Sequence, residues 1–143
     1  MTKPKPKRVL FLCTGNSARS QIAEVILREL GRGRFEAVSA GTEPRAEVHP
    51  EALLTITRHH LAADGLVPKP LSRFEGQSFD YVITLCERAR EQCPALPGAD
   101  TIHWTFPDPT AEPDEALRRR AFEDLFQTLS TRIRLLLIVD ERG

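Results

Sequence analysis

The chain has 143 residues, of which 41% are hydrophobic and 28% are charged, as is typical of one ordinary globular domain with a buried core. Twenty basic and twenty acidic side chains cancel to a formal charge of zero, so no overall positive field is available to attract nucleic acid or an anionic membrane. No apolar stretch approaches membrane-spanning length, and the basic N-terminus lacks the apolar segment of a secretory signal. We therefore expect one cytoplasmic domain over residues 1–143, with a flexible arm at 1–7 and no nucleic-acid or membrane partner.

Short apolar runs alternate with amphipathic segments along the chain, a pattern that indicates strands joined by crossover helices over a parallel sheet. We predict strands at 8–13, 34–41, 80–86 and 101–106. We predict helices at 22–30, from Pro50 to about residue 63, and after Pro113, although the segment 133–139 is also compatible with a strand. The expected fold is a three-layer α/β sandwich, in which helices flank a four-stranded parallel sheet.

The chain has three cysteines, at positions 13, 86 and 93, and each needs a local explanation because an isolated cysteine is more often a small buried hydrophobe than a nucleophile. Their number and spacing fit neither a secreted disulfide framework nor paired zinc knuckles. The four histidines also lack partners at ligand spacing. We therefore predict no metal site and no cofactor.

Cys13 ends the first predicted strand and precedes a predicted helix, which is where ligands bind in sheets of this kind. The residues after it can wrap a concave loop whose backbone N–H groups point inward and bind a tetrahedral oxyanion, and Gly15 and Asn16 tolerate the positive φ angles that such a loop needs. Arg19 offers a guanidinium to the anion, and Ser20 offers a hydroxyl to the Cys13 sulfur. The partial positive charge at the helix N-terminus and the charge of Arg19 predict a lowered pKa for the Cys13 thiol. This predicted oxyanion loop consists of Thr14, Gly15, Asn16, Ser17, Ala18, Arg19 and Ser20.

The sequence CTGNSARS at 13–20 resembles the active-site loop of the low-molecular-weight protein tyrosine phosphatases. Together with the following residues QIAE, the segment is more similar to the thioredoxin-coupled arsenate reductases, which have the same fold. The resemblance extends over nearly the whole chain and is densest at 13–24 and 84–94. It implies that Cys13 is the nucleophile, that Arg19 clamps the oxyanion, and that Asp108 in the motif FPDP is the general acid.

The other two cysteines bear on the choice between these families, because a phosphatase needs one thiol whereas a reductase must supply two electrons. Cys86 ends the third predicted strand, so it belongs to the same rim of the sheet as Cys13. The resemblance to the reductases implies that Cys13 attacks arsenate, that Cys86 then attacks the Cys13 sulfur and releases arsenite, and that Cys93 attacks Cys86. Thioredoxin would reduce the final Cys86–Cys93 disulfide, and glutaredoxin or another thiol remains open as the reductant.

Three functions stay open at this point. A monomeric arsenate reductase serving arsenic detoxification, with arsenate or its analogues phosphate and sulfate in the loop, explains all three cysteines. A phosphatase that hydrolyses phosphomonoesters through a Cys13 phosphocysteine leaves Cys86 and Cys93 unexplained, although weak phosphatase activity can persist in a reductase. A non-catalytic oxyanion-binding or redox-sensing module would keep the loop and a regulatory disulfide without turnover.

The segment ERAREQ between Cys86 and Cys93 consists of good helix formers. A helix would separate the two cysteines by about 10 Å along its axis. A disulfide needs Cα atoms about 5.5–6 Å apart. We therefore predict that this segment loses its helix when the Cys86–Cys93 disulfide forms.

Two positions depart from the family pattern. Ala18 stands where many relatives have a cysteine, which leaves the proposed relay intact. Some family members bind potassium through an asparagine, a glutamate, a serine and an aspartate; Asn16, Glu24 and Ser39 match, but Arg73 takes the approximate place of the aspartate. We therefore expect no potassium site, and we expect the three matching residues to brace the loop by hydrogen bonds.

Overall fold

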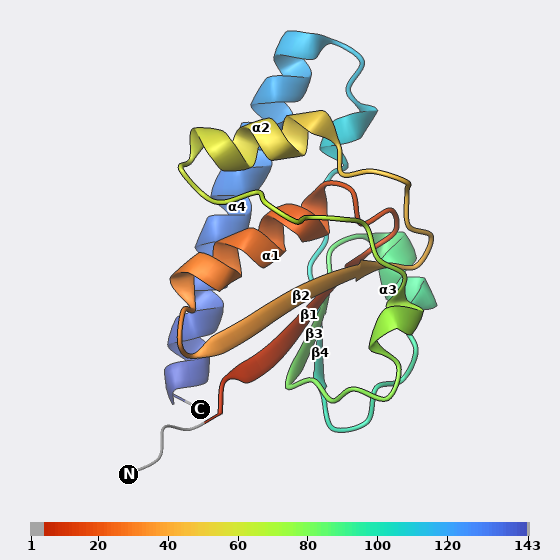
Figure 1. Ribbon diagram of the computed structural model, residues 1–143, viewed down its shortest axis with the longest axis vertical. Coiled ribbons are helices and arrows are strands. Elements are labelled where there is room, and N and C mark those ends of the chain that lie inside the picture. Colours follow the sequence, from red (N-terminus) through yellow and green to blue (C-terminus); the bar gives the residue numbers. More distant parts are fainter. Residues whose placement is uncertain (1–4, 143) are drawn as a thin grey trace.

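The structure of the chain is a computed structural model that describes residues 5–142 and contains a four-stranded parallel sheet. Its strands are β1 (Lys7–Cys13), β2 (Phe35–Gly41), β3 (Tyr81–Thr84) and β4 (Asp100–His103), in the order β2-β1-β3-β4. Cys13 pairs with Gly41, and Leu12 pairs with Thr84, so the carboxyl ends of the three strands meet at one edge of the sheet (Figure 1). The predicted parallel sheet is confirmed.

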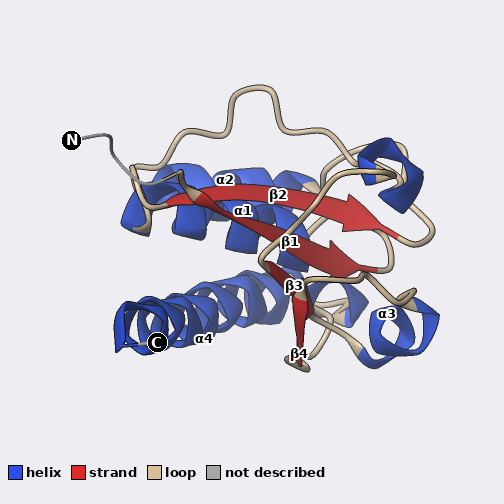
Figure 2. Cartoon of the chain, turned by 90° about the horizontal axis from the view of Figure 1, so that it is seen from below, coloured by secondary structure: helices blue, strands red, loops and turns tan. Residues whose placement is uncertain are grey.

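Helices cover both faces of the sheet, as predicted (Figure 2). They are α1 (Arg19–Leu30), α2 (Pro50–Arg58), α3 (Glu87–Gln92) and α4 (Glu115–Arg142), with short 3-10 turns at Leu71–Phe74 and Pro109–Ala111. Helices α1 and α4 pack side by side on one face, α2 packs against both of them, and α3 lies across the sheet from them. The molecule therefore has three layers.

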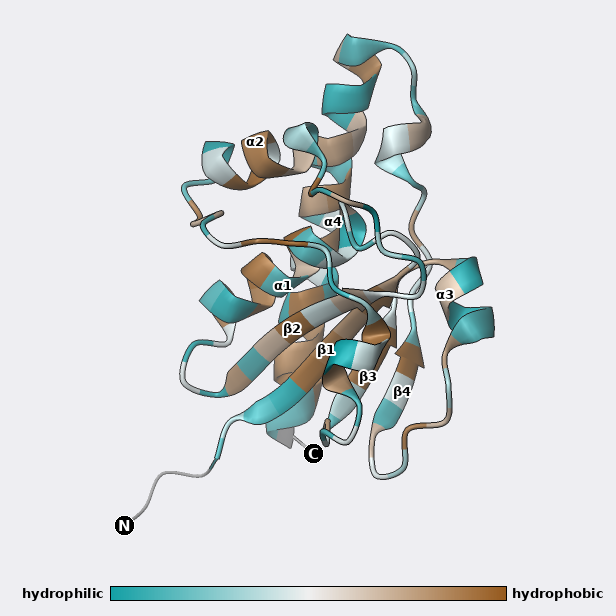
Figure 3. Ribbon diagram, turned by 45° about the vertical axis from the view of Figure 1, so that its right-hand side comes forward, coloured by the Kyte–Doolittle hydropathy of each residue, from teal (hydrophilic) through white to brown (hydrophobic). Residues whose placement is uncertain are grey.

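Strand β1 lies at the centre of the core because side chains cover both of its faces. Leu10 and Phe11 point to opposite faces, and both are 0% exposed. The ring of Phe11 lies 6.4 Å from that of Trp104, over which Arg132 of α4 extends. Leu10 instead lines a small cavity with Leu71 on the other face. Strand β1 is accordingly mainly hydrophobic beyond its first residues, as expected for a strand buried on both sides, whereas β4 at the edge of the sheet is mostly exposed (Figure 3).

Two helix predictions are corrected by the structure. Helix α2 ends at Arg58 instead of near residue 63, because His60 adopts the left-handed conformation with φ of 60° and the chain turns there. The strand alternative for residues 133–139 is wrong, since these residues belong to α4. Ile133 and Leu136 are buried at helical spacing in that segment. Within residues 5–142, no helix has both the length and the apolar character to cross a membrane.

Some strand boundaries also differ from those predicted. Strands β3 and β4 end at Thr84 and His103, earlier than the apolar runs in the sequence suggest. The next residue of each, Leu85 and Trp104, still donates a backbone hydrogen bond to the neighbouring strand, but regular pairing goes no further. At the N-terminus, Lys7 is not part of a flexible arm: it begins β1 and forms an ion pair with Asp140 at the end of α4. Residues 1–4 of the predicted arm lie outside the described residues.

The packing of α4 predicts the effect of truncating its core side chains. Leu129→Ala removes a fully buried side chain, and we expect it to lower the free energy of unfolding by about 2–5 kcal/mol. The matched control is Leu135→Ala on the same helix, because Leu135 is 52% exposed and should cost at most about 0.5 kcal/mol. Urea denaturation measures both values, and equal losses in the two variants would contradict this packing.

Candidate active site

The predicted oxyanion loop lies at the carboxyl edge of the sheet, between the end of β1 and the start of α1. Gly41, at the end of β2, lets the loop approach the sheet closely, because a Cβ atom at that position would lie 2.6 Å from the carbonyl oxygen of Thr14. The N–H groups of Gly15, Ser17 and Ala18 have no acceptor among the described residues. The first turn of α1 also has no side-chain cap and no acidic residue. These free donors at a helix N-terminus favour an anion.

Asn16 fixes the shape of this loop. Its backbone adopts the left-handed conformation, with φ of 50°, as the sequence predicted, whereas Gly15 does not have a positive φ. The side-chain amide donates to the hydroxyls of Ser20 (2.6 Å) and Ser39 (3.0 Å). Its oxygen accepts from the Gln21 amide (3.1 Å) and from the backbone N–H of Lys69 (2.8 Å). Every hydrogen-bonding position of this buried amide is therefore used within the protein.

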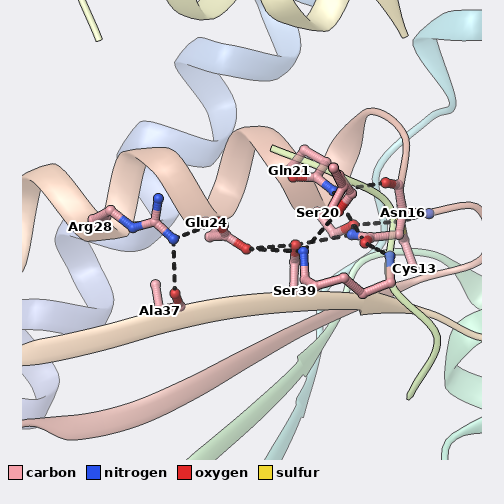
Figure 4. A network of polar contacts seen from close by, with 10 residues as sticks. Cys13, Asn16, Ser20, Gln21, Glu24, Arg28, Ala37 and Ser39 are labelled. Carbon is pink, nitrogen blue, oxygen red and sulfur yellow. Dashed lines mark hydrogen bonds and ion pairs between the residues drawn. The ribbon is translucent and has the colours of Figure 1, made fainter. Parts of the chain in front are cut away.

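The expected bracing network is confirmed (Figure 4). The hydroxyl of Ser39 accepts from Asn16 and donates to the carboxylate of Glu24 over 2.8 Å. Glu24 is 4% exposed and forms an ion pair with Arg28 at 2.6 Å. The ammonium group of Lys69 lies 3.8 Å from the other oxygen of Glu24. Glu24 therefore faces two positive charges, those of Arg28 and Lys69. The expectation of no potassium site, which rests on Arg73 in the sequence, stays a prediction.

Cys13 is 2% exposed at the base of the loop. Its sulfur lies 2.8 Å from the hydroxyl of Ser20 and accepts a hydrogen bond from the N–H of Asn16 at 3.3 Å. Because the Asn16 amide donates to the Ser20 oxygen, the Ser20 hydroxyl proton is free to point at the sulfur. Burial nevertheless raises the pKa of the Cys13 thiol, against the lowering effects of Ser20, Arg19 and Asn16. The predicted contact with Ser20 is confirmed, and the predicted lowering of the pKa of Cys13 is wrong.

Arg19 and Asp108 meet at the mouth of the loop. A guanidinium nitrogen of Arg19 donates to the carbonyl oxygen of Phe106 (3.0 Å), and another lies 3.9 Å from the Asp108 carboxylate. Burial would raise the pKa of Asp108, but hydrogen bonds from the side chain and backbone of Thr110 and the charges of Arg19 and Arg45 lower it below its usual value. Asp108 is therefore a carboxylate at neutral pH in this state.

Cys86 lies close to the loop, as the shared rim predicted. Its sulfur is 3.3 Å from the hydroxyl of Thr14, and the residue is 7% exposed. Cys86 precedes α3, whose helical conformation between the cysteines is confirmed, and Cys93 follows it. The Cys93 sulfur donates to the carbonyl oxygen of Pro94 at 3.5 Å, and burial raises the pKa of its thiol. All three thiols are free, and the structure brings Cys86 to the loop but leaves Cys93 at the far end of α3.

A cavity of about 420 Å³ opens above the loop. Cys13, Arg19 and Asp108 line it, as predicted. The cavity is also lined by residues that the sequence did not single out: Glu43, Arg45, Arg88 and Thr110. Glu43 and Arg45 lie between β2 and α2, Arg88 lies in α3, and Thr110 lies in the 3-10 turn Pro109–Ala111. Tertiary packing brings these segments together, so no local pattern in the sequence identifies the four residues. No aromatic side chain lines this cavity within the described part of the chain.

Comparisons with known proteins agree on one family. Residues 8–141 match the family described as low molecular weight phosphotyrosine protein phosphatase. The chain is 32% identical to an arsenate reductase of Halalkalibacterium halodurans, over 87% of this chain and 94% of that protein. It is 31% identical to a glutaredoxin arsenate reductase of Synechocystis, over 78% of this chain and 86% of that protein.

Solved structures give the same relationship. A thioredoxin-dependent arsenate reductase of Corynebacterium glutamicum superposes with a TM-score of 0.76 and 28% identity, over 96% of this chain and 63% of that longer chain. An arsenate reductase in a phosphate-binding state also gives a TM-score of 0.76, with 26% identity over 92% of this chain and 97% of the other.

The contact between Ser20 and Cys13 gives a prediction that needs no substrate. Ser20→Ala removes a hydrogen bond that lowers the pKa of the Cys13 thiol, so the pKa should rise further and the rate of alkylation at neutral pH should fall several-fold. The measurement is the rate of Cys13 alkylation by iodoacetamide against pH, followed by peptide mass spectrometry. Ser72→Ala, at an exposed position in the turn Leu71–Phe74, is the control. An unchanged pH profile in Ser20→Ala would show that the hydroxyl does not stabilise the thiolate.

Proposed function

Because the chain belongs to the low-molecular-weight phosphotyrosine protein phosphatase family, we propose that its oxyanion loop binds arsenate and that the protein is an arsenate reductase. The observation that carries this proposal is the position of a second thiol at the loop, where the Cys86 sulfur contacts Thr14 at 3.3 Å. A hydrolase has no use for that thiol. The arsenate reductases among the relatives support the same choice.

In the first step, the Cys13 sulfur attacks arsenic as a thiolate. An arsenic–sulfur bond forms, an arsenic–oxygen bond breaks, and Asp108 gives a proton to the departing oxygen, which leaves as water. Asp108 must therefore gain a proton when the anion binds. Approach of a negative charge raises the pKa of a nearby carboxyl, so the substrate itself favours this protonation. The free loop N–H groups and Arg19 bind the remaining oxygens.

In the second step, the Cys86 thiolate attacks the Cys13 sulfur. A Cys13–Cys86 disulfide forms, and the arsenic–sulfur bond breaks with its electron pair remaining on arsenic. Arsenic(V) is thereby reduced to arsenic(III) and leaves as arsenite, while the two thiols are oxidised. The hydroxyl of Thr14 supports this step because it holds the Cys86 sulfur beside the loop.

In the third step, the Cys93 thiolate attacks Cys86 and releases the Cys13 sulfur. The resulting Cys86–Cys93 disulfide is then reduced by a dithiol partner, which we propose to be thioredoxin. Burial raises the pKa of Cys93 while α3 is folded. Unwinding of α3 would expose Cys93, remove that effect and bring it within reach of Cys86, so the third thiol reacts last.

Substitution of single cysteines separates the steps of this relay. We expect the reduced wild-type protein, given arsenate without a reductant, to release one equivalent of arsenite and to end with a Cys86–Cys93 disulfide. Cys93→Ser should still release one equivalent but should stop at a Cys13–Cys86 disulfide and lose turnover with thioredoxin. Cys86→Ser should release no arsenite. Arsenite is measured in the filtrate and disulfides by mass spectrometry; free thiols at residues 86 and 93 after arsenate treatment would leave only an anion-binding hydrolase or sensor.

The relay also predicts a change in secondary structure. Oxidation to the Cys86–Cys93 disulfide should unwind α3, because a helix places the two cysteines about 10 Å apart along its axis. Amide hydrogen exchange should therefore lose protection at Arg90, whose N–H donates to the Cys86 carbonyl oxygen. Protection in α1 should be unchanged and serves as the internal control. Equal protection of Arg90 in both redox forms would rule out the unwinding.

A further inference from the structure

Three guanidinium groups line the cavity above the oxyanion loop, and they differ in how their charge is balanced. Arg88 forms an ion pair with Glu43 at 2.9 Å. Arg19 lies 3.9 Å from Asp108. Arg45 forms no ion pair with any residue in the described range 5–142. Arg45 is therefore the one of these three guanidinium groups that has no ion-pair partner among the described residues.

Arg45 is held at the loop by two features of the structure. Its backbone N–H donates to the carbonyl oxygen of Gly15 at 2.9 Å. Its side chain then lies on the surface of Gly15, since a Cβ atom at that glycine would be 3.1–3.3 Å from the Nε, Cγ and Cδ atoms of Arg45. Gly15 has no positive φ, so the value of glycine at this position is the room it leaves for Arg45.

The charge of Arg45 reaches the groups on both sides of it. Burial is the largest influence on the pKa of both Asp108 and His49, raising the first and lowering the second, and the charge of Arg45 adds a smaller lowering to each. A tetrahedral anion bound in the loop would place some of its oxygens against the loop N–H groups and Arg19, and Arg45, which lines the same cavity, would face the others. A guanidinium is suited to such oxygens because its planar donor fork binds two of them at once.

We propose that Arg45 is a second oxyanion-recognition residue, which binds the mouth-facing oxygens of a tetrahedral dianion seated in the loop. Where the anion is arsenate as a substrate, this inference rests on the proposed function. Where the anion is inorganic phosphate, the inference does not depend on that function. Glu43 has the opposite effect, because it lies at the same mouth and neutralises Arg88. The balance of these side chains sets how tightly the cavity holds a doubly charged anion.

Calorimetric titration of the full-length reduced protein with inorganic phosphate tests this inference without turnover. Arg45→Gln is expected to weaken phosphate binding about tenfold, the loss of one hydrogen-bonded charge. Arg45→Lys should recover part of the affinity, since it keeps the charge and loses the fork. Glu43→Gln should tighten binding, because it frees Arg88. Arg120→Gln, at an exposed position on α4 that does not line the cavity, should bind as the wild type does.

Steady-state kinetics with arsenate add a second readout. Arg45→Gln should raise KM by about the same factor, because the variant loses a group that binds the substrate oxygens. Phosphate affinity unchanged in Arg45→Gln, or lowered equally in Arg120→Gln, would overturn the role of Arg45. If the wild type does not turn over arsenate but the variants show the expected order of phosphate affinities, the proposed reductase function is refuted. The role of Arg45 in anion binding is then still supported.

Discussion

The side-chain amide of Asn16 is the constraint on which the candidate active site depends. A left-handed backbone costs free energy for a residue other than glycine, and here it is offset by a fully paired amide that joins the loop to α1, to β2 and to the backbone of Lys69. With Asn16 held this way, neighbouring N–H groups remain without internal acceptors and converge on one cavity. The hydrogen bonds of the buried Asn16 amide thus hold the loop in a shape that leaves its backbone N–H groups available to a ligand.

Burial and ionisation of Cys13 oppose each other. Cys13 is 2% exposed at the base of the cavity, where its sulfur can meet a bound anion, but the same burial raises the pKa of its thiol. The Ser20 hydroxyl, the Asn16 N–H and the Arg19 charge offset part of this effect and stabilise the thiolate more than the thiol. The site is therefore organised to stabilise negative charge, whether on the sulfur or on an oxyanion, and Arg45 extends that organisation to the mouth.

The sequence predicted the parts of the site that are local in the chain. Cys13, Arg19 and the left-handed Asn16 lie within one strand-loop-helix unit, so spacing alone places them, and the helix formers of ERAREQ predict α3. Lys69 beside Glu24 and Arg45 on Gly15 depend on how connecting segments return to the loop, which no periodicity encodes. The pKa of Cys13 was mispredicted for a related reason: a helix terminus and an arginine are visible in the sequence, whereas the depth of burial is a property of the packed core.

Helix α3 combines two properties that a redox relay requires. It has only six residues, which is too short to be stable alone, and its surface is largely hydrophilic, with Ala89 as its buried residue (Figure 3). Little apolar surface is therefore lost when it unwinds, and local opening of such segments has a low free-energy cost. Its first turn is nevertheless tied to the site, through Cys86 at Thr14 and through the Arg88–Glu43 ion pair. Because an exposed ion pair contributes at most about 1 kcal/mol, this tie orients α3 without locking it.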